Sequence, residues 1–216
     1  VSNVSHDLRT PLASMHGYVE TLLIKNETLA ADERRHYLGI TRKHTQRLTQ
    51  LVGDLFELSK LESPRNNRGT AKLRLAELLQ DVTQEFELEA EKKGVVIEAQ
   101  TTPEGANVFA DIGLMQRVLE NLIRNALRHT PSGGKITISL AKGPGAVAVA
   151  VADTGCGIAE EDLERVFDRF YRGDPADEDA YASAGLGLAI VRKILDLHGS
   201  RITVQSAVNQ GTRFEF

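Results

Sequence analysis

Residues 8–22 read LRTPLASMHGYVETL and carry an amphipathic helical pattern. The large apolar residues of this stretch recur at alternating spacings of four and three: Leu8, Leu12, Met15, Val19 and Leu22. This spacing is typical of the apolar seam of a helix that packs in a bundle. The stretch therefore predicts one long helix with a single packed stripe.

A second seam follows a break at residues 26–32. It keeps the same rhythm in Leu38, Thr41, Thr45, Leu48, Val52 and Leu55. Asp32 is placed to cap this second helix, so the two helices should form an antiparallel hairpin. Because one hairpin alone would leave its stripe in water, we predict that two copies join as a homodimeric four-helix bundle.

Residues 63–69, SPRNNRG, are polar, contain both helix breakers and lack periodicity. We place a linker at residues 64–72, between a helical hairpin at 1–63 and a second domain at 73–216. In the second domain the pattern predicts helices and strands in alternation. The expected helices are 75–93, 111–129 and 186–197, and the expected strands are 95–99, 136–140, 147–151, 202–204 and 212–216. This second domain should be an α/β layered structure.

The bulk composition excludes several classes of function. The chain has 216 residues, with 26 basic and 30 acidic side chains, and no basic block of the kind that binds nucleic acid. Its single cysteine, Cys156, cannot form an intrachain disulfide, which fits a reducing compartment. No stretch approaches the roughly 20 apolar residues that cross a bilayer. Val1 opens directly into a helical pattern without a cap, so we expect sensor or membrane segments upstream.

His6 is a candidate nucleophile on the first helix. Extending the seam backwards places Ser5 on the packed stripe, so His6, about 100° further round, should face solvent. The carboxylate of Asp7 can orient the imidazole or take its proton. Pro11 removes a helical hydrogen bond nearby and favours a bend. These features alone favour an ordinary surface histidine and a tolerated kink over a functional site.

Two asparagines mark a polar face on the helix expected at 111–129. Asn121 and Asn125 lie four residues apart, so their amides share one side, with Arg128 and His129 a turn further on. An amide oxygen is a suitable ligand for Mg²⁺, and Asn125 is the better candidate. A solvated helix face would show the same spacing.

Two glycine-containing loops are candidates for nucleotide contacts. Asp153 ends a strand and precedes Gly155 and Gly157, so its carboxylate could accept a hydrogen bond from an adenine amine. Further on, the run Gly185, Leu186, Gly187 and Leu188 opens a helix, where free backbone N–H groups favour phosphate. Each of these patterns is common when it occurs alone.

Taken together and in order, these segments resemble the motifs of bacterial sensor histidine kinases. The string SHDLRTPL at residues 5–12 resembles the H-box. The strings NLIRNALRHT, DTGCGI, VFDRFYR and GLGLAI resemble the N, G1, F and G2 boxes of the ATP domain, whose fold is shared with gyrase-type and chaperone-type ATPases. The five motifs cover nearly the whole chain.

The resemblance implies a role for each motif. His6 would be the phosphoacceptor, Asp7 its acid–base partner, and Thr10 the residue that positions water in a phosphatase reaction. Asn125 would hold Mg²⁺ with Asn121 nearby, Arg128 and His129 would contact phosphate, and Asp153 would recognise adenine, with Gly155 and Gly157 in the loop that admits the base. Phe167 and Phe170 would anchor a mobile lid at residues 171–184, from which Arg172 could reach phosphate. Ser183 departs from the family pattern, which often has glycine there.

The implied activity is ATP-dependent phosphorylation of His6, followed by transfer of the phosphoryl group to an aspartate of a response regulator. The fragment would act in the cytoplasm, with the full-length protein anchored in the membrane. The first alternative is an ATPase of the same superfamily. Such enzymes typically carry a glutamate base four residues before the Mg²⁺-binding asparagine, where this chain has Asn121, and Glu120 lies about 100° away on the helix. The second alternative is a catalytically silent dimeric scaffold that binds nucleotide.

Overall fold

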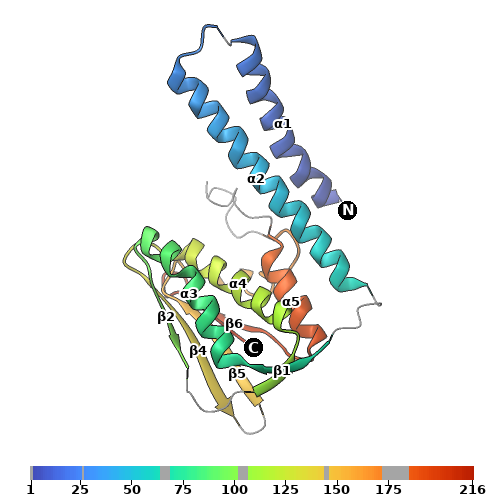
Figure 1. Ribbon diagram of the computed structural model, residues 1–216, viewed down its shortest axis with the longest axis vertical. Coiled ribbons are helices and arrows are strands. Elements are labelled where there is room, and N and C mark those ends of the chain that lie inside the picture. The colour runs from blue at the N-terminus through green and yellow to red at the C-terminus, as the bar shows by residue number, and fades with distance from the viewer. Residues whose placement is uncertain (1, 26, 64–68, 102–106, 144–145, 172–184) are drawn as a thin grey trace.

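The first part of the chain is a helical hairpin (Figure 1). The computed structural model describes residues 2–25, 27–63, 69–101, 107–143, 146–171 and 185–216, with side chains from Leu8 onward. Helix α1 (Ser2–Ile24) contains Pro11 and packs antiparallel to α2 (Ala31–Glu62). Near the hairpin turn the rings of Tyr18 and Tyr37 stack with their centroids 5.6 Å apart. The two predicted helices are thus confirmed.

The predicted cap of α2 is wrong by two residues. The N-cap is Ala30, and Asp32 lies inside the first turn. Glu33 replaces the missing cap side chain, because its Oε2 accepts a hydrogen bond from the backbone N–H of Ala30 at 3.2 Å. The carboxylate of Asp32 instead lies 3.7 Å from the guanidinium of Arg35.

The hairpin leaves much of its predicted seam exposed in the single chain. Leu12, Val19, Leu38 and Val52 are 52%, 42%, 53% and 56% exposed. A groove of about 640 Å³ lies along α1 and is lined by Leu12, Met15, Val19 and other side chains of that helix, with Thr41 from α2. This surface is not covered by any other part of the chain that the structure describes.

The second domain contains seven strands and three α-helices among the described residues. In chain order they are β1 (Ala71–Arg74), α3 (Leu75–Lys93), β2 (Val96–Gln100), β3 (Asn107–Ala110), α4 (Ile112–His129), β4 (Lys135–Gly143), β5 (Ala146–Asp153), the 3₁₀ turn η1 (Glu160–Asp162), α5 (Gly187–Leu197), β6 (Thr203–Ser206) and β7 (Thr212–Glu215). All three predicted helices and all five predicted strands are present, with ends shifted by three residues or fewer.

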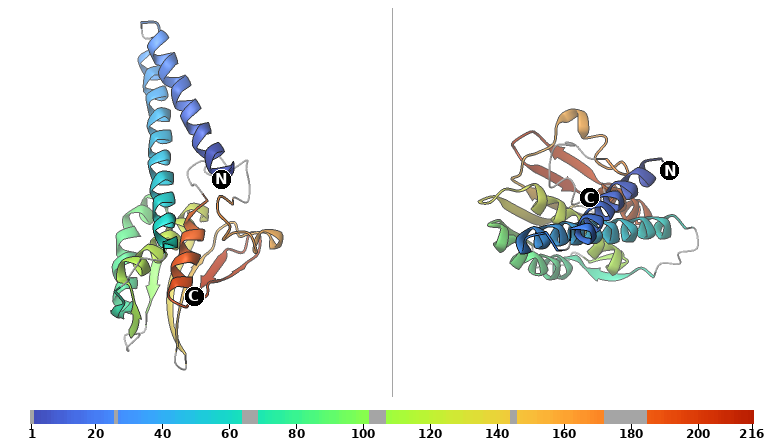
Figure 2. Two further views of the ribbon diagram at one scale, coloured as in Figure 1. Left: turned by 90° about the vertical axis from the view of Figure 1, so that its right-hand side faces the viewer. Right: turned by 90° about the horizontal axis from the view of Figure 1, so that it is seen from above.

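Five strands form one sheet in the order β2-β4-β5-β7-β6. Strands β2 and β4 are parallel, and the remaining neighbours are antiparallel. Helices α3, α4 and α5 lie together on one face of this sheet (Figure 2). The core between the two layers is fully apolar at its centre, where Leu122, Ile136 and Ile190 are completely buried. The domain is therefore a two-layer α/β sandwich.

Strands β1 and β3 were not predicted. These two strands pair with each other as a separate antiparallel sheet, with Leu73 opposite Val108. Each has four residues and ends directly before a long helix, α3 or α4, whose helical pattern dominates the local sequence. Strand β1 begins at Ala71, within the stretch expected to be linker. The boundary at residues 64–72 otherwise stays a prediction.

The end of α2 packs against the second domain. Leu51, Leu58 and Leu61 are buried on the side of α2 that contacts α5. Figures 1 and 2 show this part of α2 beside α5, while the hairpin turn projects away. The helix therefore has two apolar stripes along its length, and only the one that faces α1 was predicted. No helix in the described residues is both long enough and apolar enough to span a membrane.

Candidate functional site

Helix α4 supplies the central side chains of the candidate site. The carboxylate of Asp111 caps its first turn by accepting from the N–H of Leu114 at 3.1 Å. One face is buried in the core through Met115, Val118, Leu119, Leu122, Ile123, Ala126 and Leu127. The opposite side carries Asn121, Asn125 and Arg128, which are half-buried, and Arg124 and His129, which are exposed. The predicted polar face of this helix is therefore present.

The two asparagines have different surroundings. The Nδ2 of Asn121 donates to the backbone oxygen of Arg117 at 2.9 Å. Its Oδ1 packs so closely on the start of α5 that a Cβ on Gly187 would lie 2.9 Å away. Asn121 thus joins α4 to α5. The amide of Asn125 makes no hydrogen bond with another described residue, so its oxygen is the one available to a ligand.

The loop after β5 is held against the end of α4. The backbone N–H of Cys156 donates to the oxygen of His129 at 3.2 Å. A Cβ on Gly155 would lie 2.4 Å from the same oxygen, so only glycine permits this approach. The Sγ of Cys156 lies 4.0 Å from Nδ1 of His129. The sequence around Cys156 contains no basic residue, and the fold provides this imidazole as a neighbour.

Asp153 is a buried carboxyl group at the end of β5. The residue is only 8% exposed, and its Oδ1 accepts from the N–H of Gly155 at 2.8 Å. Burial raises the pKa of Asp153 above the usual aspartate value, although hydrogen bonds from the backbone of Gly155 and Thr212 act in the opposite direction. A partly desolvated acceptor of this kind is suited to a neutral amine donor.

Gly157 has a packing role that the motif did not reveal. Its φ is 71°, and a Cβ there would lie 1.9 Å from the backbone oxygen of Ala207. The turn between β6 and β7 crosses at this point, where the N–H of Asn209 donates to the oxygen of Cys156 at 2.7 Å. The glycine loop is thus fixed on one side by α4 and on the other by the last hairpin.

The segments on either side of the predicted lid meet each other. The N–H of Phe170 donates to the oxygen of Gly185 at 2.9 Å. Both residues have positive φ, 64° for Phe170 and 67° for Gly185. Phe167 packs edge-on against Phe214 with ring centroids 6.0 Å apart, which ties this segment to the sheet. Residues 172–184 of the predicted lid, with Arg172 and Ser183, lie outside the described residues.

The start of α5 approaches the polar face of α4. Leu186 is the N-cap residue and is fully buried, Leu188 is half-buried, and the N–H of Ile190 donates to the oxygen of Leu186 at 2.9 Å. The N–H groups of the first turn have no intrahelical acceptor. The structure therefore brings together α4, the loop of Asp153 and the start of α5, as the motifs predict.

The segment predicted to carry the phosphoacceptor lies on α1. His6 and Asp7 are within the helix, but their side chains lie outside the described part of the structure, whereas Thr10 is exposed. Figures 1 and 2 show that α1 runs away from the second domain, so its N-terminal end is the nearer one.

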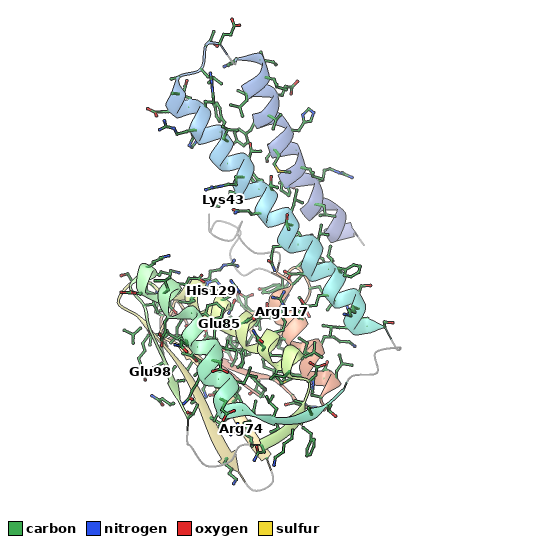
Figure 3. All side chains as sticks on the ribbon, viewed as in Figure 1. Lys43, Arg74, Glu85, Glu98, Arg117 and His129 are labelled. Atoms are coloured by element: carbon green, nitrogen blue, oxygen red, sulfur yellow. The ribbon has the colours of Figure 1, made fainter. Side chains whose placement is uncertain are left out.

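A group of charged residues between the domains was not predicted. Arg117 of α4 donates through Nε to Glu57 at 2.9 Å and through Nη2 to Asp54 at 3.1 Å, both on α2. Gln50 donates to the same oxygen of Asp54 at 2.7 Å. Figure 3 shows Arg117 and His129 at separate places along α4. The signal in the sequence was Asp54, a carboxylate in register with Leu51, Leu58 and Leu61.

Comparisons with known proteins agree with this architecture. The model of the His Kinase A (phospho-acceptor) domain matches residues 1–64, and the model of the Histidine kinase-, DNA gyrase B-, and HSP90-like ATPase matches residues 110–216. Drug sensory protein A of Synechocystis sp. is 36% identical over 226 residues, which cover 100% of this chain and 34% of that protein.

Two solved structures share the whole arrangement. Histidine kinase ThkA in complex with response regulator protein TrrA matches with a TM-score of 0.80 and 26% identity, over 100% of this chain and 59% of that one. Full-length ShkA in complex with AMPPNP matches with a TM-score of 0.72 and 27% identity, over 100% of this chain and 44% of that one.

A phosphoacceptor-type helical hairpin followed by an ATPase-type sandwich defines a two-component signalling kinase core. The chain belongs to the sensor histidine kinases. It spans between 34% and 55% of the length of the first four curated relatives.

Proposed function

We propose that this chain binds ATP in its second domain, phosphorylates His6 and passes the phosphoryl group to an aspartate of a response regulator. The observation that carries this proposal is the convergence of Asn125, the Asp153 loop and the start of α5 at one end of the sandwich, in a chain that also contains the H-box helix. The similar ShkA structure is a complex with AMPPNP, an ATP analogue, which supports the choice of nucleotide.

Each part of the site has a separate task in this proposal. The buried carboxylate of Asp153 accepts from the adenine amine, beside the loop of Gly155 and Gly157. Arg128 and His129 contact the phosphates from the end of α4. The N–H groups at Gly187 and Leu188 add a positive helix terminus on the opposite side. Phe170 and Arg172 complete the site from the lid.

Asn125 fits the part of a Mg²⁺ ligand. Its amide oxygen is a hard neutral donor on a half-buried helix face and is not taken up by another described residue. Asn121, by contrast, is engaged with Arg117 and Gly187. When bound, the ion would supply charge neutralisation on the phosphate oxygens while keeping several waters.

The reaction needs only positioning and one proton acceptor from the chain. An imidazole nitrogen of His6 forms a bond to the γ-phosphorus while the bond to the oxygen that links the β- and γ-phosphates breaks, and ADP leaves. Asp7 accepts the imidazole proton. For this the second domain must move from its contact with the end of α2 until the γ-phosphate is in line with His6. We expect this movement to occur at the predicted boundary between the two domains.

The exposed seam of the hairpin supports a homodimer. Leu12, Val19 and Val52 would become buried in a four-helix bundle of two chains, and the groove of about 640 Å³ beside α1 would be filled.

The similar ThkA structure is a complex with a response regulator protein, and we propose the same class of partner here. Thr10 is exposed on α1 and would take part in the phosphatase reaction. We propose that the fragment acts in the cytoplasm.

An ATPase of the same superfamily is less well supported. Position 121 carries an amide where those enzymes place a glutamate base. Glu120 cannot replace it, because its carboxylate accepts from Gln116 at 3.0 Å and lies 3.6 Å from the guanidinium of Arg117, on the side of α4 that faces α2. Helix α4 therefore has no carboxylate at the position from which those enzymes activate water for hydrolysis.

The test is incubation with γ-labelled ATP and Mg²⁺, followed by scoring of acid-labile, base-stable label on the protein. The parent should be labelled and the His6→Ala variant should not. His16→Ala is the matched control, because His16 is also on α1 with an 82% exposed side chain, and it should be labelled normally. Nucleotide binding without label would favour the silent scaffold, and steady release of phosphate without protein label would favour the ATPase.

A further inference from the structure

The C-terminus of α4 is the point where the phosphate-contacting residues of the proposed site are held. A helix end leaves four carbonyl oxygens without intrahelical partners. In α4 these belong to Ala126, Leu127, Arg128 and His129. Their partners come from three different segments of the chain.

Two of the four carbonyls accept from Thr130 and from the backbone of Cys156. The oxygen of Ala126 accepts from the N–H of Thr130 at 3.0 Å and from its hydroxyl at 2.6 Å, and Thr130 is only 1% exposed. The oxygen of His129 accepts from the N–H of Cys156 at 3.2 Å. The loop after β5, which contains Gly155 and Gly157, is therefore hydrogen-bonded directly to the end of α4.

The other two carbonyls share one side chain. The ammonium group of Lys93 donates to the oxygens of Leu127 and Arg128, the latter at 2.9 Å. Lys93 is the last residue of α3, so the bond joins residues that are 34 positions apart in sequence. A cation at this place also opposes the negative end of the α4 dipole.

The backbone next to Lys93 is held by its own hydrogen bonds. The position of the ammonium group is therefore set by α3 and does not depend on α4 alone. Gly94 ends α3 with φ 70°, and its oxygen accepts from the N–H of Gly133 at 2.7 Å. The N–H of Val96 donates to the oxygen of Gly134 at 3.0 Å. The turn that follows α4 is therefore hydrogen-bonded to the turn that follows α3.

We propose that Lys93 is a positioning residue of the nucleotide site, which fixes the last turn of α4 and so orients Arg128 and His129 toward the phosphates of ATP. This inference rests on the proposed function of Arg128 and His129. The ammonium group of Lys93 contacts backbone oxygens of α4, so it acts through α4 and not on the nucleotide.

The proposal predicts a selective loss of phosphate recognition. Replacing Lys93 with Met keeps the length of the side chain but leaves two carbonyls without their charged donor. Affinity for ATP should fall on the order of tenfold, as expected from loss of a charge-assisted hydrogen bond. Affinity for adenosine, which depends on Asp153, should stay the same. Lys93→Arg should restore ATP binding.

The matched control is Lys92→Met, which removes the same charge from the adjacent exposed residue and should bind ATP like the parent. Binding is measured by calorimetry or nuclear magnetic resonance titration on the 216-residue chain, with thermal unfolding as a check of the fold. If Lys93→Met does not fold, Lys93→Gln takes its place in the same comparison.

Three results would overturn the proposal: unchanged ATP affinity in the Met variant, equal loss of ATP and adenosine, or an equal loss in Lys92→Met. Failure of the parent itself to bind ATP is distinguishable, because it would remove the proposed function before any variant is compared.

Discussion

Arg117 and Asp54 form an ion pair between the two domains, with Nη2 of the arginine 3.1 Å from Oδ1 of the carboxylate. The Asp54 side chain is 9% exposed and that of Arg117 is 26% exposed, so the pair is largely shielded from water. The same guanidinium also contacts Glu57 on α2. The contact thus joins α4, the central helix of the proposed nucleotide site, to the hairpin.

Loss of Arg117 should release the second domain from α2. In Arg117→Ala the buried Asp54 and the nearby Glu57 lose their cation, and we expect docking to weaken by about 1–3 kcal/mol, less than the loss from a fully buried pair because Arg117 is partly exposed. Hydrogen exchange should increase at Leu51, Leu58 and Leu61. Arg169→Ala is the control, since its pair with Glu62 is solvent-exposed and should change exchange little. Equal exchange in Arg117→Ala and the parent would contradict the expectation.

Stability should depend on the protonation of Asp54. Burial raises the pKa of Asp54 above its ordinary value, whereas Arg117 and Gln50 act to lower it and Glu57 adds to the rise. Because the folded state then binds the proton more tightly than the unfolded state, the contribution of Asp54 to stability is greatest at low pH and is lost as pH rises from the ordinary aspartate pKa through the raised one. Asp54→Asn should flatten this slope in thermal unfolding measured across mildly acid pH. A slope as steep as that of the parent would show that Asp54 is not its source.

Adenine recognition by Asp153 should fail in acid. Its burial raises its pKa, so the carboxylate that accepts from the amine is lost at a higher pH than for an exposed aspartate. ATP affinity should therefore fall as pH drops through that raised value. Inosine triphosphate, which has no exocyclic amine, should bind weakly and without the same pH dependence. Parallel pH profiles for the two nucleotides would argue against this role.

Gly157 should tolerate no side chain. Gly157→Ala combines a φ of 71° with a Cβ 1.9 Å from the oxygen of Ala207, so the β6–β7 turn would have to move. Gly133→Ala is a matched control with a φ of 84° and no atom within 4 Å of the added Cβ. Conformation alone costs about 1 kcal/mol, and we expect Gly157→Ala to lose at least twice as much in the free energy of unfolding. Equal losses would mean that the turn adapts freely.

The proposed dimer predicts that a charge on the exposed seam is disruptive. Val52→Glu places a carboxylate on α2 where the bare side chain is 56% exposed, and it should shift the chain to monomer in sedimentation equilibrium. Leu88→Glu, on α3 with 60% exposure, should leave the oligomeric state unchanged. A dimeric Val52→Glu variant would exclude this face as the interface.

Local periodicity predicted most of the fold. Helix α4 was predictable because its apolar and polar faces are sharply divided, and α3 because its pattern runs unbroken to Lys93 and Gly94. The strands β1 and β3 were not. Each has four residues and ends directly before a long helix, which begins at Leu75 after β1 and at Ile112 after β3, so the helical pattern dominates the local sequence.

The candidate site divides in a similar way. Asn125 and Asp153 carry chemistry in their own side chains and stand in recognisable motifs. Lys93 and Arg117 act through contacts with distant segments, and nothing in their neighbouring residues marks them. The reason for Gly157 is likewise a chain crossing at Ala207, which only the fold reveals.

Helix α4 has 18 residues and is about 27 Å long. Arg117, near its beginning, is bound to the hairpin, and the backbone oxygen of the same residue accepts from Asn121 one turn along. The last turn is anchored by Lys93 and by the loop of Cys156. No proline or glycine interrupts the helix between these points. We therefore expect α4 to move as one rigid body. A displacement of its C-terminal end, at the proposed nucleotide site, would then also displace Arg117 and its contacts with α2.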